Sequence, residues 1–484
     1  MTDLLVIKPG AQKDLYQGLS KSLSGLEPPL WGALLAGYIR DKGYSVKMVD
    51  AEIEPERVIP EAKKDPRLIA IVASGTNPSA STMSMVGVRT ILKEFKKESL
   101  YSEVILMGLH PSALPERTLK EEDVSFVCQG EGFSTIWGLL SNEPCDKISG
   151  LWWKPDERLI GVEHKRIFSN PPAKLADPNL LPMPAWNLLP MDKYRAHNWH
   201  CFGGKPRQPY GVVYTSLGCP FKCSFCCINA MFGKHTIRYR NPKDVVEEIS
   251  YLHDAFGIRN LKIIDEMFDL NEKHVVDICD GLELKDLDLN IWAYARVDTI
   301  NKNKLKKMKK AGFNWLGLGY ESGNQQIRNG SSKGKFDNQK IFKVTQMIKD
   351  AGMSIGGNFI FGLPGDDFNS MYQTAQLMKK LNCEWANLNV CMPYPGSDLF
   401  KKTSVEDMPE SWLGYSQYGY LTKPLSTKYL TPAEILAFRD RAFNDYYERK
   451  EYQDMMLHKF GVETVHQIQE MLQHKLHRKI LEEE

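Results

Sequence analysis

The stretch Gly218-Cys219-Pro220-Phe221-Lys222-Cys223-Ser224-Phe225-Cys226 carries three cysteines on what reads as one loop. It follows the candidate strand 211–216, so the thiols lie at the carboxyl end of that strand. A [4Fe-4S] cube takes four cysteine ligands, and three on one loop leave one iron open to another molecule. Structural zinc sites use two separated ligand pairs instead, and no second Cys-x2-Cys or His-x3-5-His pair follows. The stretch therefore predicts an iron–sulfur cluster with an open iron.

Further candidate strands continue from this loop in alternation with helical patterns. Including the first, they lie at 211–216, 260–265, 290–295, 315–320, 356–361 and 385–391. Six β/α units are too few to close an eight-stranded ring, so we expect a partial (β/α)6 barrel of the TIM type over residues 206–400. Catalysis in such barrels takes place at the carboxyl ends of the strands, where the cysteine loop stands.

The order of the cysteines leaves two ligand registers, because Cys227 can replace Cys226 as the third ligand. The pattern Cys219-x3-Cys223-x-Phe225-Cys226 resembles the signature of the radical S-adenosylmethionine (SAM) superfamily, with Phe225 in its aromatic position. This resemblance favours Cys226. It implies that the open iron binds the amino and carboxylate groups of SAM. One electron from the cluster then cleaves SAM to methionine and a 5′-deoxyadenosyl radical.

The resemblance extends to the ends of the later strands. It implies SAM contacts from Phe225, Asp265, Glu266, Arg296, Glu321, Ser322 and Gly362. Two plainer interpretations stay open. Asp265 is equally well explained as a helix-capping acid, and Arg296 and Glu321 can form a mutual ion pair, because an unpaired buried charge is costly. The sequence assigns no further catalytic residue.

Residues 1–142 predict a separate α/β domain, doubly wound and Rossmann-like, of the flavodoxin type. Its β-rich runs lie at 4–7, 45–49, 68–73, 104–107 and 124–127, and amphipathic stretches such as 30–42 separate them. Ligands of such domains bind beyond the carboxyl ends of the strands. Those ends here are residues 8–10, 74–78, 108–112 and 129–132.

A doubly wound domain ahead of such a barrel resembles the cobalamin-binding radical SAM proteins, many of which are methylases. The segments that carry this resemblance are 27–50, 107–111 and 129–132. It implies a cobalamin held by Ser74, Gly75, Thr76, Asn77, Gly108, His110, Gly130 and Glu131. The Asp-x-His-x-x-Gly motif that supplies an axial histidine elsewhere is missing after the first strand, so we expect no histidine ligand. The alternative is a nucleotide-like or vestigial site, with His110 bracing its loop.

Two regions flank the barrel. Residues 143–205 predict an irregular connector with a hairpin around 150–160, and residues 401–484 predict a mainly helical region. Thr431-Pro432-Ala433-Glu434 combines a capping box with a proline at the first helical position. We expect this region to pack on the barrel. Its aromatic residues serve either as core or as a substrate wall: Trp412, Tyr415, Tyr418 and Tyr420.

Composition excludes several protein classes. The chain has 484 residues, 42% hydrophobic and 25% charged, as expected for a globular protein of two or three domains. A net charge of +2 indicates no nucleic-acid partner, and the sequence predicts neither a bilayer span nor a signal peptide. Ten cysteines are too few for a disulfide scaffold, which favours the cytoplasm. Cys201, Cys383 and Cys391 are expected to be buried thiols, with a second redox centre as the alternative.

The implied function is that of a radical SAM enzyme, first of all a cobalamin-dependent methyltransferase. The deoxyadenosyl radical removes a hydrogen atom from an unactivated carbon, methylcobalamin supplies the methyl group, and a second SAM restores it. Oxidative cyclisation or rearrangement, with or without cobalamin, is the main alternative, and an iron–sulfur electron carrier is a third class. The expected partners are a small-molecule or natural-product substrate and an external low-potential reductant such as flavodoxin or ferredoxin.

Overall fold

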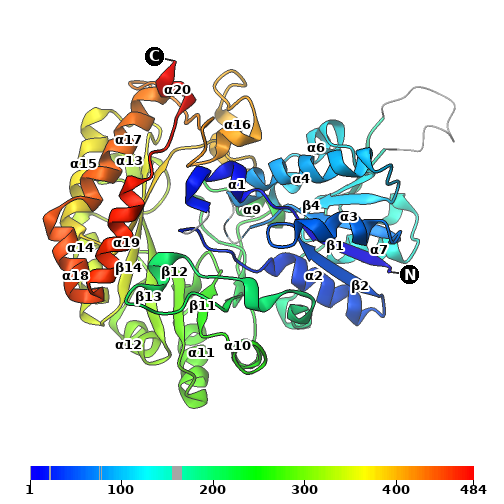
Figure 1. The fold of residues 1–484 in the computed structure, drawn as a ribbon, viewed down its shortest axis with the longest axis horizontal. Helices are drawn as coiled ribbons and strands as arrows, with labels where there is room; N and C mark the ends of the chain where they lie inside the picture. The colour runs from blue at the N-terminus through cyan, green and yellow to red at the C-terminus, as the bar shows by residue number, and fades with distance from the viewer. Residues whose placement is uncertain (1, 21–22, 76, 78, 155–165, 484) are drawn as a thin grey trace.

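The chain forms two α/β lobes, and a helical C-terminal segment runs along the outer side of the second lobe (Figure 1). The computed structural model describes all residues except 1, 21–22, 76, 78, 155–165 and 484. Among the described residues, none of the helices combines the length and apolar character needed to cross a membrane.

The first lobe is built on a sheet whose strand order is β2-β1-β3-β4-β5-β6-β7. The first five strands are parallel, and β6 and β7 add to the edge in antiparallel fashion. The strands are β1 (Leu4–Lys8), β2 (Val46–Asp50), β3 (Leu68–Val72), β4 (Val104–Met107), β5 (Phe126–Cys128), β6 (Leu151–Trp153) and β7 (Phe168–Ser169). The helices are α1 (Gln12–Leu15), α2 (Leu30–Asp41), α3 (Val58–Ala62), α4 (Ala80–Lys97), α5 (Leu109–Ala113), α6 (Pro115–Glu121) and α7 (Phe133–Leu140).

Helices cover both faces of this sheet, because alternate side chains of a strand point to opposite sides. Leu4 and Val6 of β1 join the core cluster that contains α2, whereas Leu5 and Ile7 join the cluster that contains Val58 of α3. The doubly wound, flavodoxin-like domain is therefore confirmed. The expected hairpin corresponds to β6 and β7, and its tip lies outside the described residues.

A six-stranded parallel sheet in the order β8-β11-β12-β13-β14-β15 forms the second lobe. The strands are β8 (Tyr210–Val213), β11 (Asn260–Ile263), β12 (Asn290–Ala295), β13 (Phe313–Glu321), β14 (Ser354–Phe361) and β15 (Trp385–Val390), and the short pair β9 (Ser216–Leu217) and β10 (Arg238–Tyr239) flanks the cysteine loop. The helices are α9 (Asn229–Phe232), α10 (Pro242–Phe256), α11 (Glu272–Lys285), α12 (Lys302–Lys310), α13 (Gln325–Gly330), α14 (Asn338–Asp350) and α15 (Phe368–Leu381). This open sheet confirms the partial (β/α)6 barrel.

The C-terminal segment is helical, as expected. It contains α16 (Asp398–Lys402), α17 (Pro432–Tyr447), α18 (Lys450–Phe460), α19 (Val462–Gln473) and α20 (Lys479–Glu482). Helix α17 begins with the predicted capping box: the Glu434 backbone N–H donates to the Thr431 hydroxyl, and the Thr431 N–H donates to the Glu434 carboxylate.

This segment covers the free edge of the barrel at β15. The Tyr447 hydroxyl accepts a hydrogen bond from the Ala386 N–H (3.0 Å) and donates to the Ala386 carbonyl (2.8 Å). Arg439 donates from Nε to the Leu388 carbonyl (2.7 Å). An open sheet edge exposes unpaired backbone groups, so side chains of α17 here take the place of a seventh strand.

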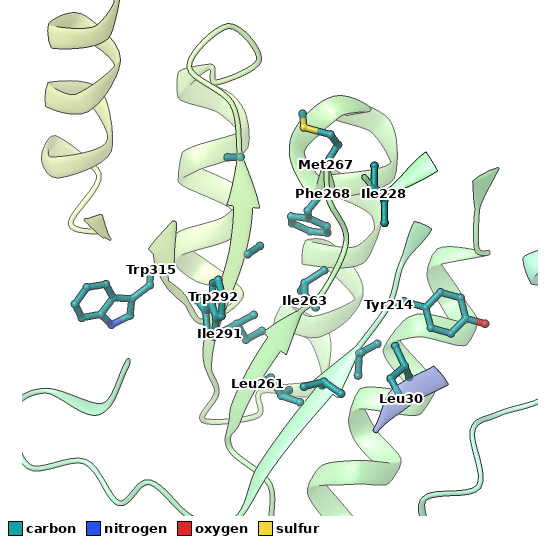
Figure 2. Packing of buried hydrophobic residues seen from close by; sticks show 14 of the residues in the cluster. Leu30, Tyr214, Ile228, Leu261, Ile263, Met267, Phe268, Ile291, Trp292 and Trp315 are labelled. Atoms are coloured by element: carbon teal, nitrogen blue, oxygen red, sulfur yellow. The ribbon is translucent and has the colours of Figure 1, made fainter. Parts of the chain in front are cut away.

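The two lobes share one hydrophobic core. Figure 2 shows Leu30 of α2 near Tyr214, which follows β8, and both belong to the buried cluster that contains Leu261 of β11 and Ile291 of β12. The lobes are therefore joined by packing as well as by the connecting chain.

The region predicted as a connector also closes the amino end of the barrel. The ring of Trp199 lies 5.1 Å from the rings of both Trp292 and Trp315 and 6.3 Å from that of Trp385. These three residues lie near the beginnings of β12, β13 and β15. The interior of the barrel therefore opens toward the carboxyl ends of the strands, where the cysteine loop lies.

Candidate active site

The cysteine loop is held in a tight conformation at the carboxyl end of β8. Gly218 has a φ of +90°, and a Cβ at this position would collide with the Thr236 carbonyl oxygen, so only glycine suits it. The next residue, Cys219, is buried, whereas Cys223 and Cys226 are partly exposed. The loop thus presents three free thiols within residues 219–226, a donor set that can hold three irons of an iron–sulfur cube and leave the fourth open.

Two cations stand beside this loop. Arg296 stacks on Phe221 at 3.8 Å from the ring centre, and its Nη1 lies 3.8 Å from the Cys223 sulfur. Arg296 also donates to the backbone carbonyl of Lys333, whose ammonium group pairs with Glu321 at 2.7 Å. Positive charge near Cys223 suits a cluster whose thiolate ligands are anionic.

The possible ion pair between Arg296 and Glu321 does not form. Arg296 binds both carboxylate oxygens of Asp298 at 2.8 Å, and Glu321 binds Lys333. No three His, Cys, Asp or Glu side chains among the described residues meet closely enough to hold a single metal ion. A cube instead places each thiolate on a different iron.

A cavity of about 850 Å³ occupies the barrel interior below the cysteine loop. Phe225, Cys226 and Glu266 lie on its wall, so two residues of the loop and one expected SAM contact meet there. Burial raises the pKa of Glu266 to about 7, although Lys262 and Lys333 oppose this shift. The cavity brings the exposed side of the cluster loop and a carboxyl group to one space large enough for SAM and a small organic molecule.

The deeper wall of this cavity combines aromatic rings with amides. Its barrel residues are Lys262, Trp292, Tyr294, Gly317, Gly356, Asn358, Ile360, Trp385, Asn387 and Asn389. A Cβ at Gly356 would meet no atom within 4 Å, so this glycine leaves open space. Asn387 donates to Asn358 at 2.9 Å, while the side chain of Asn389 makes no hydrogen bond with the described residues. Such a wall can bind a ring and hydrogen-bond its edge.

Asp265 has a different role from Glu266. It is buried and accepts hydrogen bonds of 2.6 Å from the Thr215 backbone, the Thr215 hydroxyl and the Ser216 hydroxyl. Burial raises its pKa, and these hydrogen bonds oppose that shift. It therefore fixes the chain that leads from β8 to Cys219 rather than capping a helix, and it lies on the wall of a second, smaller cavity.

The remaining expected SAM contacts lie behind the cavity walls. The Ser322 hydroxyl is 3.2 Å from that of Thr374 and accepts from the Asn324 N–H. Gly362 has a φ of +76° and lies against Ile435. Neither residue is part of the wall of the two cavities, so both shape the turns that follow β13 and β14.

The smaller cavity, of about 200 Å³, lies between the lobes. Ser74, Gly75 and Asn77 form its wall on the first lobe, while residues 216–218 and 264–266 face them from the barrel. Thr76 lies outside the described residues. The two cavities share Tyr16, Ser24, Glu27, Asn77, Met83, His197 and Glu266. Small residues with backbone donors thus stand at the strand ends, where doubly wound domains bind their ligands.

The other expected cobalamin contacts lie away from this wall. His110 is buried, its Nδ1 is 3.2 Å from the Thr82 hydroxyl, and its ring meets Trp412 edge-on at 4.5 Å. Burial, with the charges of Arg117 and Arg89, lowers its pKa to about 3. In the structure His110 thus braces its loop, and it lies on the wall of neither cavity.

The other three expected cobalamin contacts, Gly108, Gly130 and Glu131, also contact other parts of the protein. Gly108, with a φ of +128°, lies against the Ala73 carbonyl, and the Gly130 N–H donates to the Ser112 hydroxyl (3.0 Å). Glu131 pairs with Arg238 of the second lobe at 2.7 Å. Glu131, which the sequence suggested as a cobalamin contact, therefore forms an ion pair between the lobes in the structure.

Sequence reasoning missed two parts of the site. Glu27 contacts Lys262 across the lobes at 3.3 Å and lies on the wall of both cavities. No motif announces such a contact, because it depends on how the lobes meet. The polar barrel wall had a signal, however: Asn387 and Asn389 alternate with apolar residues in β15, which is the pattern of a strand with one polar face.

Comparisons with known proteins agree with this geometry. Residues 213–378 match the family model described as Radical SAM superfamily, and residues 17–140 match the B12 binding domain. A protein of Pyrococcus horikoshii that is named an uncharacterized methyltransferase is 30% identical over 459 residues, covering 93% of each chain. The anaerobic magnesium-protoporphyrin IX monomethyl ester cyclase of Rubrivivax gelatinosus is 24% identical over 89% of this chain and 75% of that protein.

Among solved structures, one of TsrM from Kitasatospora setae resembles the whole two-lobed fold. It is described as a radical S-adenosylmethionine methyltransferase with cobalamin and a [4Fe-4S] cluster bound. The match has a TM-score of 0.63 and covers 82% of this chain and 74% of that one, at 16% sequence identity. At this identity the likeness concerns the fold.

Proposed function

Because this chain belongs to the family of cobalamin-dependent radical SAM methyltransferases, we propose that it methylates an unactivated carbon of a small organic molecule held in the barrel cavity. As a radical SAM enzyme it uses a [4Fe-4S] cluster, SAM and cobalamin as cofactors. When bound, these groups supply a 5′-deoxyadenosyl radical for hydrogen abstraction and a methyl group for transfer.

The observation that carries the proposal is the wall shared by the two cavities. Asn77 from the first lobe and Glu266 from the barrel both lie on this shared wall, and Cys226 lies on the wall of the larger cavity. A substrate in the barrel would therefore contact both the cluster side and the side of the first lobe. Methyl transfer to a substrate radical needs this double access.

The roles of single residues follow from their places. We assign the cluster to Cys219, Cys223 and Cys226, the SAM side of the cavity to Phe225 and Glu266, and the face of cobalamin to Ser74, Gly75 and Asn77. The deeper wall with Asn358, Asn387 and Asn389 is left for the substrate. A substrate that fills this cavity would exclude water from a radical, which protects the radical from side reactions.

We further infer a reducing cellular environment and a dedicated electron donor. Radical SAM enzymes need a low-potential reductant, and flavodoxin or ferredoxin would serve. All ten cysteines are free, which suits the cytoplasm, where thiols stay reduced.

Anaerobic turnover with methyl-deuterated SAM tests the proposal. Once the substrate is found, a methyltransferase should form 5′-deoxyadenosine and S-adenosylhomocysteine in comparable amounts and place the label on the product. Turnover that yields deoxyadenosine with no label in the product would instead support a cyclase, the activity named for the relative from Rubrivivax gelatinosus.

A further inference from the structure

Three exposed lysines stand on three segments around the cluster loop. Lys222 lies on the loop itself, Lys335 lies between α13 and α14, and Lys402 ends α16. None of them lies on the wall of either cavity or pairs with an acidic side chain of the described residues. We call these residues the rim lysines.

Backbone hydrogen bonds bring the three segments together at Ser224. Its N–H donates to the Ser331 carbonyl at 3.1 Å, and its carbonyl accepts from the Leu399 N–H at 2.9 Å. The rim lysines are therefore on neighbouring segments that meet beside Cys223, although they are far apart in the sequence.

Cys223 and Cys226 lie on different sides of the loop. Cys226 is on the wall of the larger cavity, whereas Cys223 is partly exposed and belongs to the wall of neither cavity. SAM and the substrate take up the cavity side of a bound cluster. An external donor therefore approaches most closely on the side of Cys223.

This surface is more basic than the chain as a whole. Residues 218–228, 331–337 and 398–402 carry five lysines and two aspartates, whereas the net charge of all 484 residues is only +2. Lys333 and Lys401 are paired, with Glu321 at 2.7 Å and Asp398 at 3.2 Å. The rim lysines thus leave an uncompensated positive charge around the exposed cluster ligand.

We propose that the rim lysines form the docking site of a small, acidic, low-potential electron-transfer protein of the flavodoxin kind. Electron-transfer complexes bury small interfaces and are transient, and complementary charges on the two partners steer their encounter. In the step, the flavin of the donor loses one electron and the oxidised cluster gains one. The proposal needs the cluster of the proposed function but not methyl transfer.

Charge reversal tests the docking site. At low salt, the variant Lys222→Glu/Lys335→Glu/Lys402→Glu should have an affinity for flavodoxin at least about tenfold lower than that of the wild type. Calorimetry with the cluster-loaded protein measures this affinity. High salt should reduce the difference. The matched control is Lys93→Glu/Lys96→Glu/Lys285→Glu, which changes the charge equally at exposed lysines on α4 and α11 and should bind as the wild type does.

Cluster reduction gives a second readout. The rim variant should be reduced slowly by flavodoxin and at the wild-type rate by dithionite. Equal flavodoxin affinity of the rim and control variants would overturn the proposal, and so would an equal loss of rate with dithionite. Normal flavodoxin-driven deoxyadenosine formation without labelled product would instead contradict methylation alone.

Discussion

At the scale of single residues, Cys226 and Cys227 compete for one position. Both lie on the wall of the larger cavity, and Cys227 is the more buried. We expect Cys226→Ala to lose the cluster and all SAM cleavage, because it removes one of three ligands, and Cys227→Ala to keep both. Iron analysis and deoxyadenosine assays measure the two effects. Loss of iron from Cys227→Ala alone would reverse the ligand register.

His110 should make the free energy of unfolding depend on pH in the mildly acidic range. Its pKa is lowered to about 3 by burial, whereas an unfolded histidine titrates near 6.5. Between these two pKa values the unfolded state binds a proton at His110 and the folded state does not. The free energy of unfolding therefore decreases as pH falls below about 6.5, by about 2 kcal/mol at pH 5.

The variant His110→Asn isolates this contribution. It loses the contact with Trp412 and is less stable at every pH, but its stability should fall less steeply between pH 7.5 and 5. Urea unfolding of both proteins at these two pH values measures the difference. Parallel pH dependence in the two proteins would contradict the linkage.

At the scale of elements, the regular strands were predictable from the sequence, whereas the structure of the irregular segments was not. Runs such as 68–73 and 104–107 contain only apolar side chains, and each forms a buried parallel strand close to its expected bounds. Burial on both faces imposes such a run, so local sequence suffices. The capping box at Thr431 was readable for the same local reason.

Long-range contacts explain most of what the sequence could not show. The packing of Trp199 against three strands and the ion pair of Glu131 with Arg238 join residues that are far apart in the chain. His110 looked like a cofactor contact because its position after a strand is typical of one. Only the packing of Trp412, about three hundred residues later, shows that it is enclosed.

The hydrogen bonds between α17 and the edge strand β15 can be tested by removing a single hydroxyl group. Tyr447→Phe leaves the Ala386 N–H without its acceptor and the Ala386 carbonyl without its donor in a fully buried place. We expect a loss of about 1–3 kcal/mol in the free energy of unfolding, because unsatisfied buried groups are costly. Tyr372→Phe, at an exposed position of α15, is the control and should change nothing in the same denaturation experiment.

At the scale of the whole molecule, the pair of Glu131 and Arg238 links the lobes. Arg238→Met leaves a nearly buried carboxylate without its cation and should cost about 3 kcal/mol. The double variant Glu131→Gln/Arg238→Met should recover part of this loss, because no charge is then left unpaired. A double-mutant cycle in denaturant measures the coupling, and simple additivity would show that the pair contributes nothing.

The space between the lobes sets the last prediction, which concerns cobalamin. Ser74 lies at the carboxyl end of β3 on the wall of the smaller cavity, and residues 216–218 of the barrel face it. Ser74→Trp places an indole where a corrin ring would lie. We expect the variant to lose stoichiometric corrinoid, measured by absorbance after anaerobic purification with hydroxocobalamin, because a flat ligand cannot share this space.

The cysteine loop lies on the other lobe, so the variant should keep its cluster and its dithionite-driven SAM cleavage. Ser102→Trp, at the opposite end of the same sheet before β4, is the matched control and should retain both the corrinoid and the cluster. Corrinoid bound as tightly by Ser74→Trp as by the wild type would place cobalamin elsewhere. Loss of corrinoid and cluster together would mean that the lobes no longer meet, whereas loss of corrinoid alone would show that the cobalamin site depends on the strand end at Ser74 and the cluster does not.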